Sequence, residues 1–297
     1  MNSVTVRAPA STANLAAGFD ILGCALKLYN TLCFTVSDRL SFSGCDPKWQ
    51  NADNLAWRAF SRTFETAGKQ VPNVHIDIRS NIPAAGGMGS SAAMLAAGVL
   101  AANAIGELEL SKDTLLAIAT ELEGHPDNVA PALYGGLIAC MQEDGHIFTS
   151  RYTPHPSLHF VILSPDFPLS TQKARSVLPT SVSRADAIYN CAHLVMLLRA
   201  LENGDEPMLT ASLRDRLHQP YRFPLIDEYD NVRSIAERNN CNALCISGAG
   251  PALLCLTCDP SFAGRMENDL KAMHHYWRVL DLAVDNVGAK ILSSEGN

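Results

Sequence analysis

The segment that most restricts how this chain can fold is the run Pro-Ala-Ala-Gly-Gly-Met-Gly-Ser-Ser-Ala-Ala at residues 83–93. Before it, residues 74–78 alternate with period two, which predicts a strand; after it, the Ala- and Leu-rich residues 90–105 predict a helix. Glycines lack a Cβ, so the loop's backbone N–H groups can point at one small anion, and the unpaired N–H groups at the helix start add to them.

Two serines at the start of the predicted helix make a nucleotide the best candidate for that anion. The hydroxyls of Ser90 and Ser91 can reach phosphate oxygens or a magnesium ion. The segment has no Gly-Lys-Ser/Thr, so it is not a Walker A loop, and it lacks the context of a dinucleotide-binding fingerprint. A tight strand-to-helix turn whose small residues serve packing is the alternative.

The remaining elements alternate helices and strands without a repeat. Further strands are expected at 2–8, 31–37, 137–141, 159–163, 243–246, 253–257, 279–283 and 289–292. Further helices are expected at 54–67, 112–123 with Ser111 as its cap, near 128, and at 185–203, 232–239 and 260–274. Gly and Pro cluster at 145–157, which predicts a boundary between two α+β domains, residues 1–153 and residues 154–297.

Composition excludes several classes of protein. The 297 residues suffice for roughly two domains, and the net charge of −7 disfavours general binding to nucleic acid. No apolar run approaches the ~20 residues of a membrane span, so we expect a soluble protein. Nine scattered cysteines, an odd number, indicate a reducing, cytoplasmic location. Cys241, Cys245, Cys255 and Cys258 could hold zinc, but their spacing and apolar neighbours favour buried thiols.

Residues 83–93 resemble the phosphate loop of the GHMP kinases, with Met88 in place of the usual Leu. The segment 247–251 resembles the third GHMP motif, and three further segments, at 123–136, 174–179 and 219–222, resemble motifs of the homoserine kinases within that superfamily. So does the segment 9–23, although Ala16 and Ala17 replace the usual Gly-Pro. The resemblance extends in one order from residue 4 to about 292. It implies an N-terminal domain like ribosomal protein S5 and a C-terminal ferredoxin-like domain.

The resemblance also implies an activity: ATP- and Mg²⁺-dependent phosphorylation of the side-chain hydroxyl of L-homoserine to O-phospho-L-homoserine, in threonine biosynthesis. A GHMP kinase for mevalonate or shikimate is the nearest alternative, and a silent nucleotide or metabolite sensor is another. Homodimers are common among such relatives, although the sequence reveals no interface. The ATP-binding residues implied are Asn54, at the adenine, and Pro83, Ala84, Ala85, Gly86, Gly87, Met88, Gly89, Ser90, Ser91, Ala92 and Ala93. Asn54 would look the same as a simple helix cap.

For the amino-acid substrate, the resemblance assigns Asn14 and Asp20 to the ammonium group and Arg175 and Arg222 to the carboxylate. This is chemically reasonable, because an ammonium needs acceptors and a guanidinium binds a carboxylate through two hydrogen bonds. The site would then lie in the cleft between the two domains. Gly248 and Gly250 are expected to support the phosphate loop or approach the substrate.

The remaining predicted residues follow the helix 112–123. By resemblance, Glu123 provides the carboxylate for Mg²⁺ together with Ser90 or Ser91, a choice that the sequence leaves open; Glu121 is the weaker candidate. His125, Asp127 and Asn128 would lie near the reacting hydroxyl. Asn128 cannot take up a proton at neutral pH. The base is therefore Asp127 or the γ-phosphate itself, and phosphoryl transfer can proceed chiefly by positioning and electrostatics.

Overall fold

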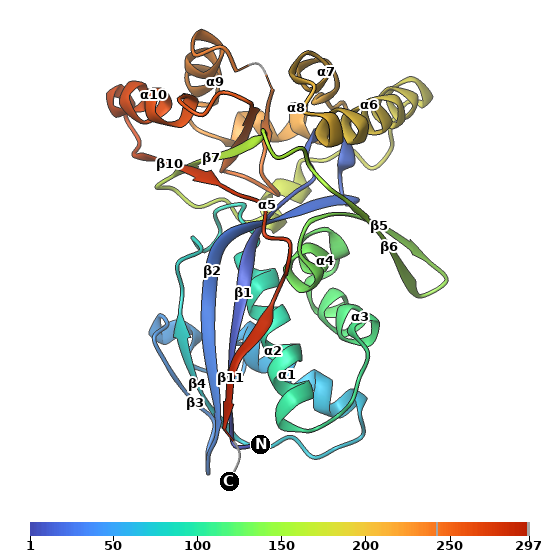
Figure 1. The fold of residues 1–297 in the computed structure, drawn as a ribbon, viewed down its shortest axis with the longest axis vertical. Coiled ribbons are helices and arrows are strands. Elements are labelled where there is room, and N and C mark those ends of the chain that lie inside the picture. Colours follow the sequence, from blue (N-terminus) through green and yellow to red (C-terminus); the bar gives the residue numbers. More distant parts are fainter. Residues whose placement is uncertain (242, 296–297) are drawn as a thin grey trace.

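The computed structural model describes residues 1–241 and 243–295, and its strands form two sheets with helices packed against them (Figure 1). The larger sheet has the order β11-β1-β2-β4-β3, with β5 pairing β2 and β6. Its described pairings are antiparallel apart from β3 with β4. Its strands are β1 (Ser3–Ala13), β2 (Leu22–Val36), β3 (Ser41–Ser43), β4 (Val74–Arg79), β5 (Leu137–Glu143), β6 (His146–Tyr152) and β11 (Lys290–Glu295).

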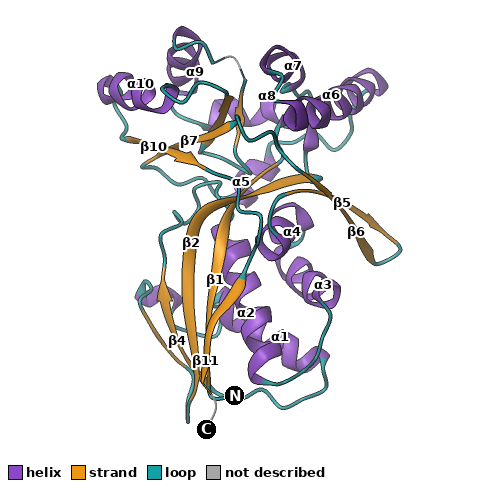
Figure 2. Ribbon diagram, viewed as in Figure 1, coloured by secondary structure: helices purple, strands orange, loops and turns teal. Residues whose placement is uncertain are grey.

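The second sheet is antiparallel, in the order β10-β7-β9-β8. Its strands are β7 (His159–Pro165), β8 (Leu244–Ile246), β9 (Leu253–Thr257) and β10 (Trp277–Leu282). Figure 2 shows most helices of this half lying away from the first sheet, whereas α5 lies at the junction of the two halves. They are α5 (Thr171–Ser176), α6 (Arg184–Asn203), α7 (Glu206–Ser212), α8 (Gln219–Arg222), α9 (Tyr229–Arg238) and α10 (Phe262–Asp269).

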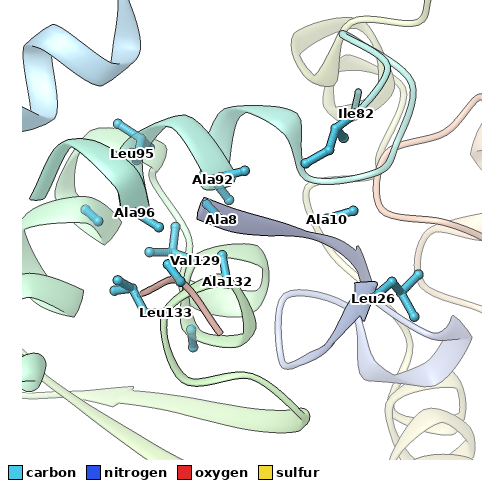
Figure 3. Close-up of a cluster of buried hydrophobic side chains, with 14 of the residues drawn as sticks. Ala8, Ala10, Leu26, Ile82, Ala92, Leu95, Ala96, Val129, Ala132 and Leu133 are labelled. Atoms are coloured by element: carbon cyan, nitrogen blue, oxygen red, sulfur yellow. The ribbon is translucent and has the colours of Figure 1, made fainter. Parts of the chain in front are cut away.

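Small side chains let the first half's helices approach its sheet closely. These helices are α1 (Leu55–Thr66), α2 (Ser90–Ile105), α3 (Lys112–Glu123) and α4 (Pro126–Tyr134). Figure 3 shows Ala8 of β1 beside Ala92 of α2, with Ala96 of α2 and Ala132 of α4 nearby, and all four are buried. Close packing of short side chains holds the start of α2 and the last turn of α4 firmly against β1.

The buried apolar core continues from one half of the chain into the other. One cluster includes Val4 and Phe34 of the first sheet together with Phe160 of β7 and Leu197 of α6. A second cluster, between the second sheet and helices α9 and α10, contains Val232, Phe262 and other residues. The two halves therefore pack on each other through apolar surface, which fixes the geometry of anything that lies between them.

The last strand returns to the first sheet. β11 pairs antiparallel with β1, Ser3 opposite Glu295, although the predicted second domain of residues 154–297 includes it. The region 145–157, which the sequence predicts as the domain boundary, contains the strand β6 at residues 146–152. Asp144 and Gly145 both have positive φ and make the two-residue turn of the β5–β6 hairpin, as Asp-Gly pairs do.

Among the described residues, none of the helices combines the length and the apolar character required to cross a bilayer.

Candidate active site

A cleft of about 280 Å³ lies between the two halves. Most of the site residues predicted from the sequence line this cleft, and residues 169–171 line it as well. Of the predicted site residues, Asn54, Pro83, Ala84, Ala92 and Ala93 do not line it. Residues more than two hundred positions apart, such as Asn14 and Gly248, are thus brought together by the fold.

The loop before α2 has the backbone geometry of an anion cradle. Gly87 and Gly89 have φ of 74° and 65°, and a Cβ on Gly89 would lie 2.0 Å from Ser11 Oγ. Gly89 caps α2 without any side-chain hydrogen bond to the first turn. The N–H groups of that turn are therefore available to a ligand in the cleft, and the helix dipole favours an anion there.

Two serines outside the loop hold it in place. The backbone N–H of Ser11 donates to Met88 O at 3.1 Å, and Ser11 Oγ donates to Asn128 Oδ1 at 2.9 Å. From the second half, Ser247 Oγ lies 2.6 Å from Gly87 O. The sequence motifs contain both serines, but their hydrogen bonds to the loop could be found only in the structure.

Glu123 and Ser91 face each other at the end of α3. Ser91 Oγ donates to Glu123 Oε1 at 2.5 Å. Burial raises the pKa of Glu123, and the hydrogen bond from Ser91 offsets part of that effect. Glu121 instead pairs with Arg62 at the surface, at 2.9 Å. Ser91 and Glu123 are therefore the serine and the glutamate that form a pair of hard oxygen donors.

His125 and Asp127 form a second pair at the start of α4. His125 Nδ1 lies 2.5 Å from Asp127 Oδ1, and the Asp127 side chain is 1% exposed. Burial alone would lower the pKa of His125, but the hydrogen bond and charge of Asp127 outweigh it, so this pKa is raised. His125 precedes α4 but makes no side-chain hydrogen bond to the first turn of that helix.

The predicted substrate-binding side chains pair with one another. Arg175 binds both carboxylate oxygens of Asp20, at 2.6 and 3.0 Å, and this hydrogen bonding raises the pKa of Arg175. Asn14 Nδ2 donates to Gly248 O at 2.7 Å, and Asn14 Oδ1 accepts from the backbone N–H of Asp20. Asn14 thereby holds the β1–β2 loop against the 247–251 turn.

Arg222 is an unusual arginine, because it is 1% exposed yet lines the cleft. Its guanidinium donates to the carbonyl oxygens of Ala174 and Gly248, at 3.1 and 3.4 Å. Burial and then the nearby charge of Arg175 lower its pKa to about 10. Phe19 lies between the two cations, its ring centre 5.5 Å from Arg175 and 5.0 Å from Arg222.

His218 supports Arg222 and is a residue that the sequence reasoning missed. It is fully buried, lies 2.9 Å from Ala16 O through Nε2, and lies 3.3 Å from Arg222 Nη1 through Nδ1. Its ring stacks on Phe19 at 4.8 Å. A neutral imidazole protonated on Nε2 satisfies both contacts, since Nδ1 can then accept from the guanidinium. Its position directly before the 219–222 motif was the available signal.

Two other predictions concern residues away from the cleft. Asn54 is buried as the cap of α1: its Oδ1 accepts from Ala56 N and its Nδ2 donates to Trp49 O. These are the contacts of a helix cap, and the assignment of Asn54 to the adenine of ATP stays a prediction. Cys241, Cys245 and Cys255 are buried free thiols, and Cys241 Sγ donates to Leu256 O at 3.5 Å. Burial among apolar residues is typical of thiols that pack in a core.

Comparison with known proteins identifies the chain's relatives. The family models for the GHMP kinases' N-terminal and C-terminal domains match residues 54–136 and 197–275. A homoserine kinase of Clostridium botulinum is 36% identical over 97% of this chain and 98% of its own length. One of Trichodesmium erythraeum is 42% identical over 86% of this chain and 87% of its own.

Solved structures give the same result for the fold. A homoserine kinase from Cytophaga hutchinsonii superposes with a TM-score of 0.89 at 28% identity, covering 98% of both chains. A mevalonate kinase of L. major, in complex with R-mevalonate, has a TM-score of 0.72 at 13% identity, covering 95% of this chain and 96% of its own, and shows the shared fold alone. The expected two-domain α+β architecture of the GHMP kinases is thereby confirmed.

Proposed function

This chain belongs to the homoserine kinases of the GHMP kinase family, and from that premise we propose that it transfers the γ-phosphoryl group of ATP to the side-chain hydroxyl of L-homoserine. The products are ADP and O-phospho-L-homoserine, a step toward threonine. One observation carries the proposal. The uncapped start of α2 and the arginines Arg175 and Arg222 line the same cleft, so a phosphate and a carboxylate can be held together.

The charge balance of the cleft favours a zwitterionic substrate. Asp20 and Arg175 already neutralise each other, and a ligand that reached only one of them would leave the other unpaired in a half-buried site. An amino acid brings an ammonium group for Asp20 and a carboxylate for Arg175 and Arg222. Mevalonate and shikimate carry no ammonium group, so they would leave the Asp20 carboxylate without a counter-charge.

We infer that Glu123 and Ser91 hold the Mg²⁺ that ATP chemistry requires. Mg²⁺ prefers one or two hard oxygen ligands plus water and substrate phosphates, and these two oxygens lie beside the phosphate loop. A second group, Asp20, His125 and Asp127, also has ligand atoms within 4.8 Å of one another. It fits less well, because an imidazole is a poor ligand for Mg²⁺ and Asp20 is bound to Arg175. When bound there, the ion would neutralise negative charge on the phosphate groups.

The proton of the substrate hydroxyl has two possible acceptors, Asp127 and the γ-phosphate. The Asp127 carboxylate lies 2.5 Å from His125 Nδ1, so the imidazole already occupies one of its oxygens and competes with a substrate hydroxyl for it. We therefore assign Asp127 and His125 to positioning and electrostatic stabilisation, with the proton passing to the phosphate.

The variant Asp127→Asn tests this assignment. We expect it to keep measurable turnover, with kcat lowered by roughly 10- to 100-fold, because the amide oxygen still accepts from His125 while the charge is lost. Steady-state kinetics with homoserine and ATP give the answer. A complete loss of turnover, with homoserine binding intact by calorimetry, would show that Asp127 is the base.

The activity itself is tested by ADP release with ATP and Mg²⁺ against homoserine, serine, mevalonate and shikimate. We expect saturable turnover with homoserine alone. Arg175→Lys is the matched control, since lysine keeps the positive charge but cannot form the bidentate hydrogen bonds of a guanidinium. We expect it to raise the KM for homoserine and to leave the KM for ATP unchanged. ATP binding without turnover on any substrate would instead identify a sensor.

The free thiols support a location in the cytoplasm.

A further inference from the structure

A second cavity, of about 460 Å³, lies in the second half of the molecule. It is larger than the catalytic cleft, and its volume lies within the range of sites that hold small organic molecules. Helices α6, α8 and α9 border it (Figure 1), and we call it the α8 cavity. Among the described residues, the two cavities share no lining residue. The proposed reaction therefore leaves the α8 cavity without a role.

Three arginines line the α8 cavity. Arg214 and Arg216 belong to the loop before α8, and Arg233 belongs to α9. Arg214 has no ion pair within residues 1–241 and 243–295, and Arg216 has a long one, 3.4 Å from Asp186. Arg233 Nε donates to Glu237 at 2.8 Å, which leaves its other guanidinium N–H groups available. In a protein of net charge −7, three arginines around one cavity favour an anion as its ligand.

The two acidic residues that line the α8 cavity are already engaged. The Asp215 side chain is fully buried, and its carboxylate accepts from Asn190 Nδ2 at 2.6 Å. The same carboxylate accepts from the backbone N–H groups of residues 217, 218 and 219. Glu237 is bound to Arg233. The hydrogen-bonding capacity that remains for a ligand therefore consists mainly of donors.

Gln219 adds a neutral donor to the arginines. The residue is 3% exposed and lines the cavity, and its Oε1 accepts from the backbone N–H of Ile246 at 2.8 Å. Its Nε2 has no hydrogen-bond acceptor within residues 1–241 and 243–295. A nearly buried amide nitrogen without a protein partner is available to an acceptor in the cavity.

The rest of the wall is apolar and aromatic. Phe223 and Tyr229 stack with their ring centres 4.1 Å apart, and the buried Leu213 lines the cavity with them. Tyr189 lies under the guanidinium of Arg216, 3.8 Å from ring centre to Cζ. An inorganic anion would reach the donors but leave this apolar wall in contact with water. A ligand with an anionic end and an apolar remainder fits both parts of the cavity.

We propose that the α8 cavity binds an organic phosphate with an aromatic or apolar remainder, whose phosphate group is held by Arg214, Arg216 and Arg233. A phosphate group offers three oxygens and accepts from several guanidinium groups at once. A carboxylate has two oxygens, and a single arginine can satisfy both of them. Three arginines from two separate elements therefore match a phosphate better than a carboxylate.

Helix α8 connects this cavity with the catalytic cleft. Asp215 binds the backbone at the start of α8, and Gln219 binds Ile246, the residue before the 247–251 turn. Arg222, in the cleft, follows Gln219 by three residues, which is about one helical turn. A phosphate beside Gln219 and a substrate carboxylate beside Arg222 would repel each other. We expect each to weaken the binding of the other by the same factor, and this expectation alone rests on the proposed function.

Calorimetry of the full chain with phenyl phosphate tests the site, with ADP and Mg²⁺ in excess to occupy the phosphate loop. We expect one bound molecule per chain. Arg214→Gln and Arg233→Gln should each weaken its binding about 10- to 100-fold, because each removes charged donors. Both arginines are exposed at the rim, so the variants should fold.

Arg238→Gln is the matched control. Arg238 is an exposed arginine of the same helix as Arg233, but it does not line the cavity, so its variant should bind phenyl phosphate like the wild type. A wild-type protein that does not bind phenyl phosphate would overturn the proposal. Equal affinities of Arg214→Gln, Arg233→Gln and Arg238→Gln would overturn it as well.

Two further probes test the class of ligand. Inorganic phosphate lacks the apolar part, and benzoate carries a carboxylate in place of the phosphate. Each should bind at least about tenfold more weakly than phenyl phosphate. Benzoate binding of equal strength would contradict the assignment to a phosphate, and inorganic phosphate binding of equal strength would contradict the role of the aromatic wall.

Steady-state kinetics measures the coupling to the catalytic cleft. With phenyl phosphate present, the KM for homoserine should rise about two- to tenfold in the wild type and stay unchanged in Arg214→Gln. An unchanged KM in the wild type, or an equal rise in both proteins, would overturn the coupling. The binding measurements need no turnover, so failure of the α8 cavity proposal is distinguishable from failure of the proposed kinase activity.

Discussion

The guanidinium of Arg222 is held by two carbonyl oxygens and an imidazole, and none of these carries a negative charge. Among the described residues it has no salt bridge, although the charges of Asp20 and Asp215 act on it from a distance. A buried cation without a bound anion is costly, and a carboxylate entering the cleft would remove that cost. The uncompensated charge of Arg222 therefore contributes to the recognition of a substrate carboxylate.

His218 makes a part of the protein's stability depend on pH. Burial lowers its pKa from 6.5 to about 4, outweighing the attraction of Asp215. Between these values the unfolded chain binds a proton that the folded chain does not, so the free energy of unfolding falls as the pH falls. The contribution is fully present above pH 6.5 and on the order of 3 kcal/mol is lost by pH 4.

Denaturant titrations of the wild type and of His218→Gln, from pH 7 to pH 4, measure this contribution. Glutamine can still donate to Ala16 O and accept from Arg222, but it does not titrate. We expect a shallower pH dependence in the variant. Parallel curves for the two proteins would mean that His218 does not titrate in this range.

Ser90 and Ser91 are adjacent and differ in their contacts. Ser91→Ala removes the hydroxyl that faces Glu123, so we expect the Mg²⁺ concentration for half-maximal activity to rise about 10- to 100-fold. Ser90→Ala, the control, should change it far less. Equal effects of the two substitutions would contradict the assignment of the metal ligand to Ser91.

Among the elements, the loop before α2 depends on the absence of a side chain at one position. Gly89→Ala would bring a Cβ to 2.0 Å from Ser11 Oγ and would also strain a φ of 65°. Gly68→Ala is a matched control, because Gly68 has φ of 66° with nothing within 4 Å of its missing Cβ. Both should lose about 1–2 kcal/mol of stability from backbone strain, but Gly89→Ala alone should weaken ATP binding. If calorimetry gave the Gly89→Ala and Gly68→Ala variants the same affinity for ATP, the loop would tolerate a Cβ beside Ser11.

Helices were the elements best predicted from sequence. α2 and α3 begin and end as expected, because propensity and the Ser111 cap mark them locally. Strands were underestimated: β1 continues to Ala13, past Pro9, which lies at a break in the register with β2. A proline is tolerated at such a bulge, and only the pairing strand reveals it.

The candidate site was likewise predicted only in part from the sequence. Motifs identified most of the residues that line the cleft, but not their bonds to one another. Asp20 and Arg175 are 155 positions apart, and no local pattern could show that they form an ion pair in the absence of substrate. The Asp-Gly turn at 144–145, by contrast, was visible in the sequence and should have predicted the β5–β6 hairpin.

On the scale of the whole molecule, β11 pairs with β1 and so connects residues 290–295 with residues 3–7. A chain truncated before Lys290 would lose the pairing of β11 with β1 and expose a long strand edge. We expect a loss of a few kcal/mol in stability and a higher KM for homoserine, since β1 leads directly to Asn14. Thermal unfolding and steady-state kinetics measure both. A truncated protein with unchanged melting temperature would show that β11 is dispensable.

β11, the neighbour of β1, is synthesised after every other strand of the two sheets. While the ribosome is still translating the second half, β1 can pair with β2 but has no partner at its other edge. That edge stays open until β11 leaves the exit tunnel. Chaperones that shield unpaired strands during synthesis therefore have a defined target here, and a stalled chain would present the same surface to other nascent chains.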